Sequence, residues 1–521
     1  MNTFVTTAII GTGQQNQPDI RTGTAVDALT PTGEIERQLL LTAGALAAYR
    51  MAGSVPQPAE STTEPAAAEQ LPTCSPEAAR QIEQCLLNTS SDLLAQAYTL
   101  LQQARLRLPH SLLPLALDNA RQHKVLRALL IPALGERGFW LSRHNPEWSW
   151  VAHFLTDQSE ELPADAEEIW QEGTLGQRCE ILRRLRAIDP ARARDWLNTI
   201  LKQEKAEARR DLLATFASGL SIDDEPLLEQ LLTDRSESVR HQAITLLAQI
   251  PGSGLSQRML ERANALLRYE KKLAKKGQVK VSLPTTVPVE WQRDGISAQP
   301  GDNAIAQPQK EQYHNALLRQ ILDYIDPAHW EAHFSVTPDE LVNAQKNGTY
   351  AEAILTAWSE AALLFNRHDW MAPLFDWWYA KESKHYYYSS ADTKSLTLLK
   401  HMPQSEAETK VLQMLTNLST NWSNQPIAAL DALPRPWSAQ FADATFKLCR
   451  EFVQTTKDSD NRWYTWGHFL DLAGAATPTS SLETASTGWT VPERLGDQYK
   501  QNVTSLLETL QIRKTLLEEI Q

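Results

Sequence analysis

The sequence predicts an all-α fold, in which an α-solenoid of stacked helix pairs is followed by a second helical region. Three observations predict this fold. Apolar residues recur in fixed columns at a step of 31 residues through the middle of the chain. Residues typical of helix starts fall between the repeated segments. Helical spacing of apolar residues then returns from about residue 313 onward.

The bulk composition limits the possible functions. The chain has 521 residues, too many for one hydrophobic core, and its net charge of -13 argues against a function devoted to nucleic acid or anionic membranes. The four cysteines form no CxxC pair, which fits a reducing compartment. The first residues lack the features of a signal peptide, and no run of about 18 apolar residues occurs. We therefore expect a cytoplasmic protein that does not span a membrane.

The first part of the chain divides into three predicted segments. Residues 1–53 begin with a short apolar stretch and end in a helix, EIERQLLLTAGALAAYRMAG. Residues 54–74 are rich in Pro, Ala, Ser and Glu and predict a linker. Ser75 and Pro76 are typical of a helix start, and helical patterns fill residues 75–146.

Residues 147–275 contain the repeats. A step of 31 residues brings Arg178, Arg209 and Arg240 into one column. Three apolar columns follow at constant positions: Ile181, Leu212 and Ala243; Leu182, Leu213 and Ile244; and Leu185, Phe216 and Leu247. Trp150, Val151 and Phe154 occupy the same columns one step earlier. Apolar positions at i, i+1 and i+4 predict one face of a helix in each repeat.

A second helix recurs at the same step. Trp196, Leu197, Ile200 and Leu201 are matched by Leu227, Leu228, Leu231 and Leu232, and a degenerate copy lies around Met259 and Ala263. Each repeat is therefore predicted to be a pair of antiparallel helices, with roughly four repeats in the array. Asp234 and Glu237 predict a capping box, and Asp189-Pro190 predicts a helix start in an earlier repeat.

The helical pattern breaks after the repeats. Residues 276–312 contain Pro, Gly and β-branched residues without helical period, which predicts an irregular linker or a pair of short strands. Residues 313–521 then predict a C-terminal helical domain. Thr337-Pro338-Asp339-Glu340 is typical of a helix start, and a charged helix is expected from roughly Pro492.

Local motifs for catalysis or cofactors are weak. Gly11-Thr12-Gly13 resembles half of a dinucleotide-binding fingerprint, but Asn16 stands where the third glycine belongs, so a turn is the simpler interpretation. His329 and His333 could chelate a metal on one helix face, but Glu331 is misplaced for a zinc-protease motif, and packing is favoured. We predict no catalytic residue, no cofactor and no metal.

A basic run is the best candidate for an interaction surface. Its residues are Arg258, Arg262, Arg268, Lys271, Lys272, Lys275 and Lys276, followed by Lys280. Eight basic residues less Glu261 and Glu270 give this stretch a net charge of +6. A solvated helix with cations at its C-terminal end is the simplest interpretation, an acidic protein partner is the next, and a phosphate backbone is a third.

Tryptophan is abundant, with 16 in the chain. The clusters HDWMAPLFDWWYAKESKHYYY and NRWYTWGHF could form a groove for a peptide or for stacked bases. Large core residues between helices are the favoured interpretation.

Two resemblances add to this interpretation. The repeat around Asp234, Val239, Arg240 and Ala243 resembles the short HEAT-like repeats typified by phycobilin lyases, over about 120 residues. The whole chain is similar to an uncharacterised bacterial family, through TTAIIGTG, EIERQLLLTAGALAAYRMAG and GERGFWLSRHNPEWSWV. Genes of that family typically lie beside those of a SWIM zinc-finger protein, a MoxR-type AAA+ ATPase and a von Willebrand A-domain protein. The resemblance implies a component of that system and transfers no catalytic residue.

Three functions remain open at this stage. The favoured one is a non-enzymatic scaffold or adaptor that binds other proteins, including the MoxR-type ATPase and the von Willebrand A-domain protein that the family resemblance implies. The alternative is a HEAT-like nucleic-acid-binding or DNA base-repair protein. The third is an enzyme whose site lies in a pocket between the two helical regions, near residues 280–330.

Overall fold

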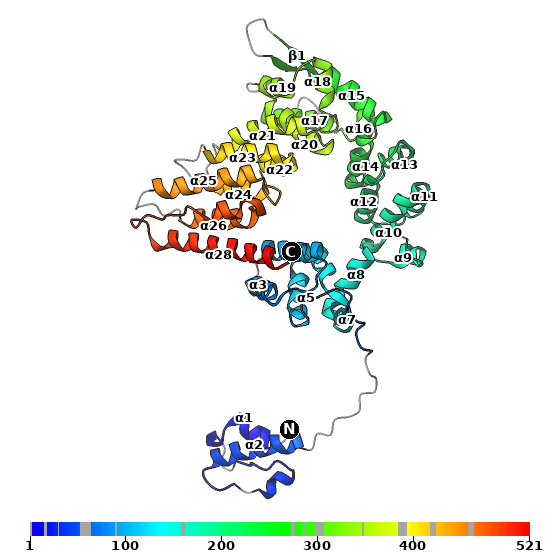
Figure 1. The fold of residues 1–521 in the computed structure, drawn as a ribbon. Helices are drawn as coiled ribbons and strands as arrows, with labels where there is room; N and C mark the ends of the chain where they lie inside the picture. The colour runs from blue at the N-terminus through cyan, green and yellow to red at the C-terminus, as the bar shows by residue number, and fades with distance from the viewer. Residues whose placement is uncertain are drawn as a thin grey trace. The chain divides into compact units, whose positions relative to one another are not determined.

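The computed structural model describes residues 3–14, 18–29, 31–52, 64–88, 91–157, 162–271, 277–284, 287–296, 307–345, 348–383, 393–416, 424–456 and 463–520. The chain forms two compact units, an N-terminal unit of residues 1–67 and a main unit of residues 68–521 (Figure 1). Helices make up nearly all regular structure of the described residues, and the sheet among them has two strands, so the predicted all-α class is confirmed. The four cysteines are free thiols.

The N-terminal unit is built on two helices, α1 (Thr3–Ile10) and α2 (Ile35–Ala52). Between them lie the 3₁₀ turns Thr12–Gln14 and Ala25–Ala28. Helix α2 confirms the helix predicted at the end of this segment. The core is small, since the large buried side chains are those of Phe4, Val26 and Leu46.

The main unit begins with thirteen helices in chain order. They are α3 (Pro76–Leu87), α4 (Ser91–Ala104), α5 (Leu113–Gln122), α6 (Arg127–Leu130), α7 (Gly135–His144), α8 (Trp150–Asp157), α9 (Ala166–Glu172), α10 (Leu175–Ile188), α11 (Pro190–Ile200), α12 (Ala206–Ala214), α13 (Glu225–Leu231), α14 (Glu237–Gln249) and α15 (Gly254–Leu266). Short 3₁₀ turns join several of them, at His110–Leu112, Lys124–Leu126, Ile131–Ala133, Pro146–Trp148, Thr215–Ala217 and Ile222–Asp224.

A hairpin and a second set of helices follow. They are β1 (Leu267–Glu270), β2 (Gln278–Val281), α16 (Val289–Arg293), α17 (Gln307–Leu322), α18 (Ala328–Phe334), α19 (Pro338–Ala344), α20 (Ala351–Leu364), α21 (His368–Glu382), α22 (Lys394–His401), α23 (Gln404–Thr416), α24 (Asn424–Ala432), α25 (Ala439–Thr455), α26 (Trp463–Ala476), α27 (Leu482–Ser486) and α28 (Asp497–Ile520), with a 3₁₀ turn at Thr479–Ser481. No helix among the described residues is long and apolar enough to cross a membrane.

The predicted apolar columns form the interior of the array. All nine residues of the three columns on α10, on α12 with the turn after it, and on α14 are buried. Helix α12 packs between α10 and α14, so the first helices of successive repeats stack on one another. Figure 1 shows α11 and α13 beside this stack. Burial of the columns follows from their spacing, because only one face of each helix can meet both neighbours.

The arginine column binds the loops that precede the repeated helices. Arg178 on α10 donates to Glu204 in the loop before α12 (2.8 Å), and Arg209 on α12 donates to Asp234 in the loop before α14 (2.7 Å). Arg240 donates to the carbonyl of Asp234 (2.8 Å). Each arginine therefore holds a loop that positions a repeated helix.

A buried ion pair adds a second inter-repeat contact. The side chains of Arg186 on α10 and Asp224 before α13 are both fully buried and form two hydrogen bonds of 2.8 Å. Burial of Asp224 raises its pKa, but the hydrogen bonds from Arg186 and the backbone of Ser221 lower it more, so its pKa lies below the usual value.

Three of the predicted helix starts are confirmed and one is wrong. Ser75, Asp189 and Thr337 cap the starts of α3, α11 and α19, and Thr337 forms a full capping box with Glu340. The capping box predicted for Asp234 and Glu237 is wrong. Ser236 is the N-cap of α14, because Asp234 instead accepts hydrogen bonds from the Ser236 amide and from Arg209.

The segments predicted as linkers contain ordered structure where they are described. Within residues 54–74, positions 54–63 lie outside the described residues, but Glu69 accepts hydrogen bonds from the backbone amides of Glu136 and Arg137 at the start of α7. Residues 276–312 include β2, α16 and the start of α17. β2 pairs with β1 in an antiparallel register that places Leu267 opposite Val281. One continuous hydrophobic core extends from Trp170 to Leu510.

Stacking continues through the C-terminal helices. Helices α20, α22, α24, α26 and α28 pack in succession in one row, and α23, α25 and α27 pack in a second row. Five tryptophans are among the largest fully buried side chains of this region: Trp330, Trp358, Trp370, Trp437 and Trp466. These residues fill the space between helices, as the favoured interpretation expects.

Helix α28 joins the end of the array to its beginning. It packs against α26 and also against α3 and α4 (Figure 1). Its residues Leu516 and Ile520 are buried in the core formed by residues of the 74–151 region. Ser75 donates a hydrogen bond to Glu519 (2.7 Å), and Arg435 pairs with Asp92 at the start of α4.

Arg513 is the central polar residue of this junction. It is 3% exposed. Its guanidinium donates to the carbonyls of Gly474 (2.5 Å) and Thr477 at the end of α26, and to the side-chain oxygen of Gln96 on α4 (2.6 Å). Burial lowers the pKa of Arg513 to about 10, so it stays charged at neutral pH. One side chain on α28 therefore contacts both the end of α26 and helix α4.

Replacing Arg513 with Ala should destabilise the junction by about 3 kcal/mol, because two buried carbonyls and the half-buried Gln96 side chain lose their donor. Hydrogen exchange in α3 and α4 should accelerate, and the urea midpoint should fall. Arg80→Ala is the matched control, since the Arg80 side chain on α3 is 72% exposed. Equal effects of the two substitutions would contradict this role of Arg513.

Candidate functional site

Two residues of the predicted basic surface form ion pairs with acidic residues of the same chain. Arg258 and Arg262 on α15 both bind Asp294, which is 2% exposed, with nitrogen–oxygen distances of 2.7 and 2.6 Å. Arg258 also pairs with Glu229 on α13 (3.0 Å). The Arg262 guanidinium lies over the Trp291 ring, 5.0 Å from its centroid. These cations are neutralised by partners that hold α16 against α15.

The carboxyl group of Asp294 is ionised at neutral pH. Burial raises the pKa of its carboxyl, but the hydrogen bonds from Arg258 and Arg262 lower it more, so the pKa lies below its usual value. Arg293 extends the network by pairing with Glu229 (2.6 Å).

The other residues of the basic run lie at the hairpin. Arg268 on β1 and Lys271 after it are exposed. Arg268 stands directly opposite Lys280 of β2, which is also exposed. Like charges in opposed positions repel each other in a two-stranded sheet. Lys272, Lys275 and Lys276 lie outside the described residues. The predicted interaction surface is therefore divided, and its binding role stays a prediction.

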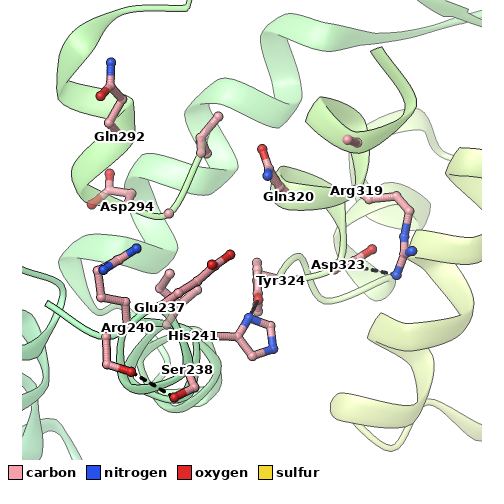
Figure 2. A pocket seen from close by; sticks show the side chains of 15 residues that line it. Glu237, Ser238, Arg240, His241, Gln292, Asp294, Arg319, Gln320, Asp323 and Tyr324 are labelled. Atoms are coloured by element: carbon pink, nitrogen blue, oxygen red, sulfur yellow. Dashed lines mark hydrogen bonds and ion pairs between the residues drawn. The ribbon is translucent and has the colours of Figure 1, made fainter. Parts of the chain in front are cut away.

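A cleft of about 850 Å³, lined by described residues, lies beside α14. Its walls are the segment after α16 and one face of α17, and its floor is the first part of α14. Figure 2 shows Gln292 and Asp294 on one side, Arg319, Gln320 and Asp323 on the other, and Glu237 and His241 on α14 between them. The cleft lies at the junction near residues 280–330.

The α17 wall carries a partly buried ion pair. Arg319 donates to Asp323 one turn later, at 3.2 Å. One carboxylate oxygen of Asp323 is buried without a hydrogen bond. Burial raises the pKa of Asp323 to about 6, and the nearby charge of Arg319 offsets only part of this effect. Glu360 raises this pKa further, and Lys394 lowers it.

A hydrogen bond joins the α17 wall to the floor. The Tyr324 hydroxyl and His241 Nδ1 are 2.9 Å apart. Burial raises the pKa of Tyr324 to about 12, so the phenol stays neutral and can donate to the imidazole. This contact and the one between His329 and Asn264 (2.7 Å) connect the repeats to the C-terminal helices.

The lining of the cleft can hold a ligand through charges and hydrogen bonds. It presents groups of both charges together with hydroxyls and amides, which can hydrogen-bond a peptide backbone and its side chains. The hydroxyls of Ser236 and Ser238 lie 3.0 Å from each other.

The weaker sequence motifs have simple structural explanations. His329 and His333 on α18 stack with ring centroids 5.2 Å apart, and no group of three metal-binding side chains occurs among the described residues. Burial lowers the pKa of His329. Gly11-Thr12-Gly13 follows helix α1, whereas the dinucleotide fingerprint follows a strand. Trp463 and Tyr464 are partly or largely exposed, at 38% and 72%.

Comparison with known proteins places the chain in a family. The model of a family of unknown function, DUF5691, matches residues 3–520. The chain belongs to this family. The predicted resemblance to an uncharacterised family is thereby confirmed. No curated protein and no solved structure matches the chain.

The sequence predicts a pocket near residues 280–330, but it does not indicate which residues line the cleft. Arg240 was identified only as a column residue, and His241, Arg319 and Asp323 carried no signal of their own. Arg319 on α17 and Asp323 just after this helix stand four residues apart, a spacing that predicts their pairing. Their approach to α14 depends on packing between distant helices.

The raised pKa of Asp323 predicts a pH effect on stability. The folded state takes up a proton near pH 6, and the unfolded state does so near pH 4, so this group stabilises the fold as the pH falls between these values. Asp323→Asn lacks this proton uptake. When the pH falls from 7.5 to 4.5, the free energy of unfolding of the wild type should rise by about 2 kcal/mol relative to that of Asp323→Asn.

Urea unfolding of both proteins across this range measures the difference. Glu290→Gln, which removes an exposed carboxylate outside the cleft, controls for the loss of any one charge. A pH-independent difference between wild type and Asp323→Asn would refute the assignment.

Proposed function

We propose that the chain is a non-enzymatic scaffold that binds another protein, with a segment of that partner seated in the cleft between α14 and α17. The observation that carries the proposal is the cleft itself, a cavity of about 850 Å³ whose lining includes groups of both charges. It stands on a continuous helical array, which can hold its walls at a fixed spacing.

The charge distribution favours a protein partner over a phosphate backbone. Proteins that bind nucleic acid present uncompensated cations to the phosphates. Here Arg258 and Arg262 are neutralised by Asp294. In the cleft, the cations Arg240 and Arg319 are accompanied by the carboxylates of Glu237 and Asp323. A peptide, which has donors, acceptors and charges of both signs, is the better complement.

The proposed partners are the MoxR-type AAA+ ATPase and the von Willebrand A-domain protein that the family resemblance implies. The resemblance also supports a bacterial source, and the unpaired cysteines fit the proposed cytoplasmic location. An array of HEAT-like helix pairs presenting a client or bridging two subunits would suit such a system.

Affinity purification of the tagged chain from its native host, followed by mass spectrometry, tests the proposal. Two variants alter the cleft, one at its floor and one at its α17 wall. Glu237→Arg reverses a charge on its floor, and Ala316→Trp fills space from α17. Recovery of the bound protein should fall about tenfold or more with either variant, equivalent to at least about 1.4 kcal/mol of binding free energy.

Glu207→Arg is the matched control, because Glu207 is exposed in the first turn of α12 and lies outside the cleft. It should retain the partner. Recovery that both cleft variants leave unchanged would contradict the proposal. Retention of duplex DNA at low salt, lost on Arg268→Glu with Lys280→Glu, would favour the nucleic-acid alternative instead.

A further inference from the structure

The N-terminal unit exposes an apolar helix face. The exposed residues Leu40, Leu41, Gly44, Ala47, Ala48 and Met51 form the outer face of α2. Leu40 is 72% exposed, Leu41 50% and Met51 79%. These residues recur at three- and four-residue intervals, so they lie together along one side of the helix.

The opposite side of α2 is already buried. Thr42 and Leu46 pack into the small core with Phe4 and Val26. The stretch from Gln38 to Tyr49 contains no charged residue. A helix that is apolar on all sides is typical of a fully buried helix, so the outer face of α2 is built to be covered.

This concentration of exposed apolar side chains is specific to the N-terminal unit. Val5, Ile9, Ile10, Leu29 and Tyr49 add to the three large residues of the outer face. In the described part of the main unit, the other large exposed apolar side chains lie on separate elements, except for the neighbours Trp463 and Tyr464 on α26: Leu87, Val125, Leu155, Ile188, Ile222, Val289, Trp463 and Tyr464. Proteins that stay monomeric rarely leave more than a few hundred Å² of contiguous apolar surface exposed.

We propose that a second copy of the chain covers this face, through an antiparallel pair of α2 helices related by a two-fold axis near Gly44. An isologous contact of this kind needs a surface that complements itself. With Gly44 opposite its own copy, Leu40 of one helix meets Ala48 of the other, and Leu41 meets Ala47. Large side chains thus face small ones, which lets the two helices approach closely.

The flanking charges also permit this pairing. In the same register Arg37 faces Met51, and Arg50 faces Gln38, so no like charges oppose each other. Glu36 faces Ala52 and already accepts a hydrogen bond from Thr12 within its own copy (2.6 Å). A charge-free centre with unopposed flanking charges matches a second copy better than it matches a charged partner.

Sedimentation velocity of the full chain over about 1 to 50 μM, a range that brackets micromolar affinities, tests the proposal. The wild type should sediment as a species of twice its 58.5 kDa mass. Leu40→Glu with Met51→Glu should give the monomer. Leu87→Glu with Val125→Glu, at positions 68% and 78% exposed in the main unit, should remain dimeric.

Gly44→Leu separates loss of pairing from loss of folding. A side chain at Gly44 meets no atom within 4 Å in the single copy, and leucine favours the helix more than glycine does. This variant should keep its helix content and become monomeric. A wild type that is monomeric throughout the range, or a dimer that survives both α2 variants, overturns the proposal. Pairing lost equally in the main-unit control also overturns it.

Discussion

The contact between α28 and the first helices of the main unit is the constraint on which the rest of the array depends. A stack of helix pairs buries each apolar face against its neighbour, but the two terminal faces have no neighbour within the stack. Here the last helix covers the first ones, and Leu516 and Ile520 enter their core. Arg513 fixes this contact by binding the end of α26 and Gln96 of α4 together.

Closure of this kind limits how far the repeats can bend. In an open solenoid, small rotations at each interface add up along the array. When both ends are joined, rotation at one interface must be offset at another. The cleft between α14 and α17 lies within this joined array, with the Asp294 network on one wall and the Tyr324–His241 hydrogen bond across it. Its shape is therefore set by the whole main unit as well as by its own side chains.

Local periodicity made much of the fold predictable. The 31-residue columns are buried as expected because helix spacing alone determines which side of each helix meets its neighbours. Thr337 and Glu340 form the expected capping box because its partners are three residues apart. Asp234 departs from the expectation because Arg209, from the preceding repeat, binds its carboxylate. A competing partner from another repeat leaves no local signal.

Contacts between residues far apart in the sequence could not be predicted. Arg258 suggested an accessible cation, but its acceptor Asp294 lies 36 residues away, beyond the hairpin. Ser75 and Glu519, which join the two ends of the array, are separated by 444 residues. Such contacts follow from the curvature of the stack, which a single sequence does not specify.

A distance measurement between α3 and α28 tests closure of the array most directly. Spin labels at Glu83 and Lys514, which are both exposed, would report the separation of the two helices in the full chain. The account predicts a single narrow distribution of short distances, as expected for helices in contact. A broad distribution extending to long distances would show an open array and contradict the central claim.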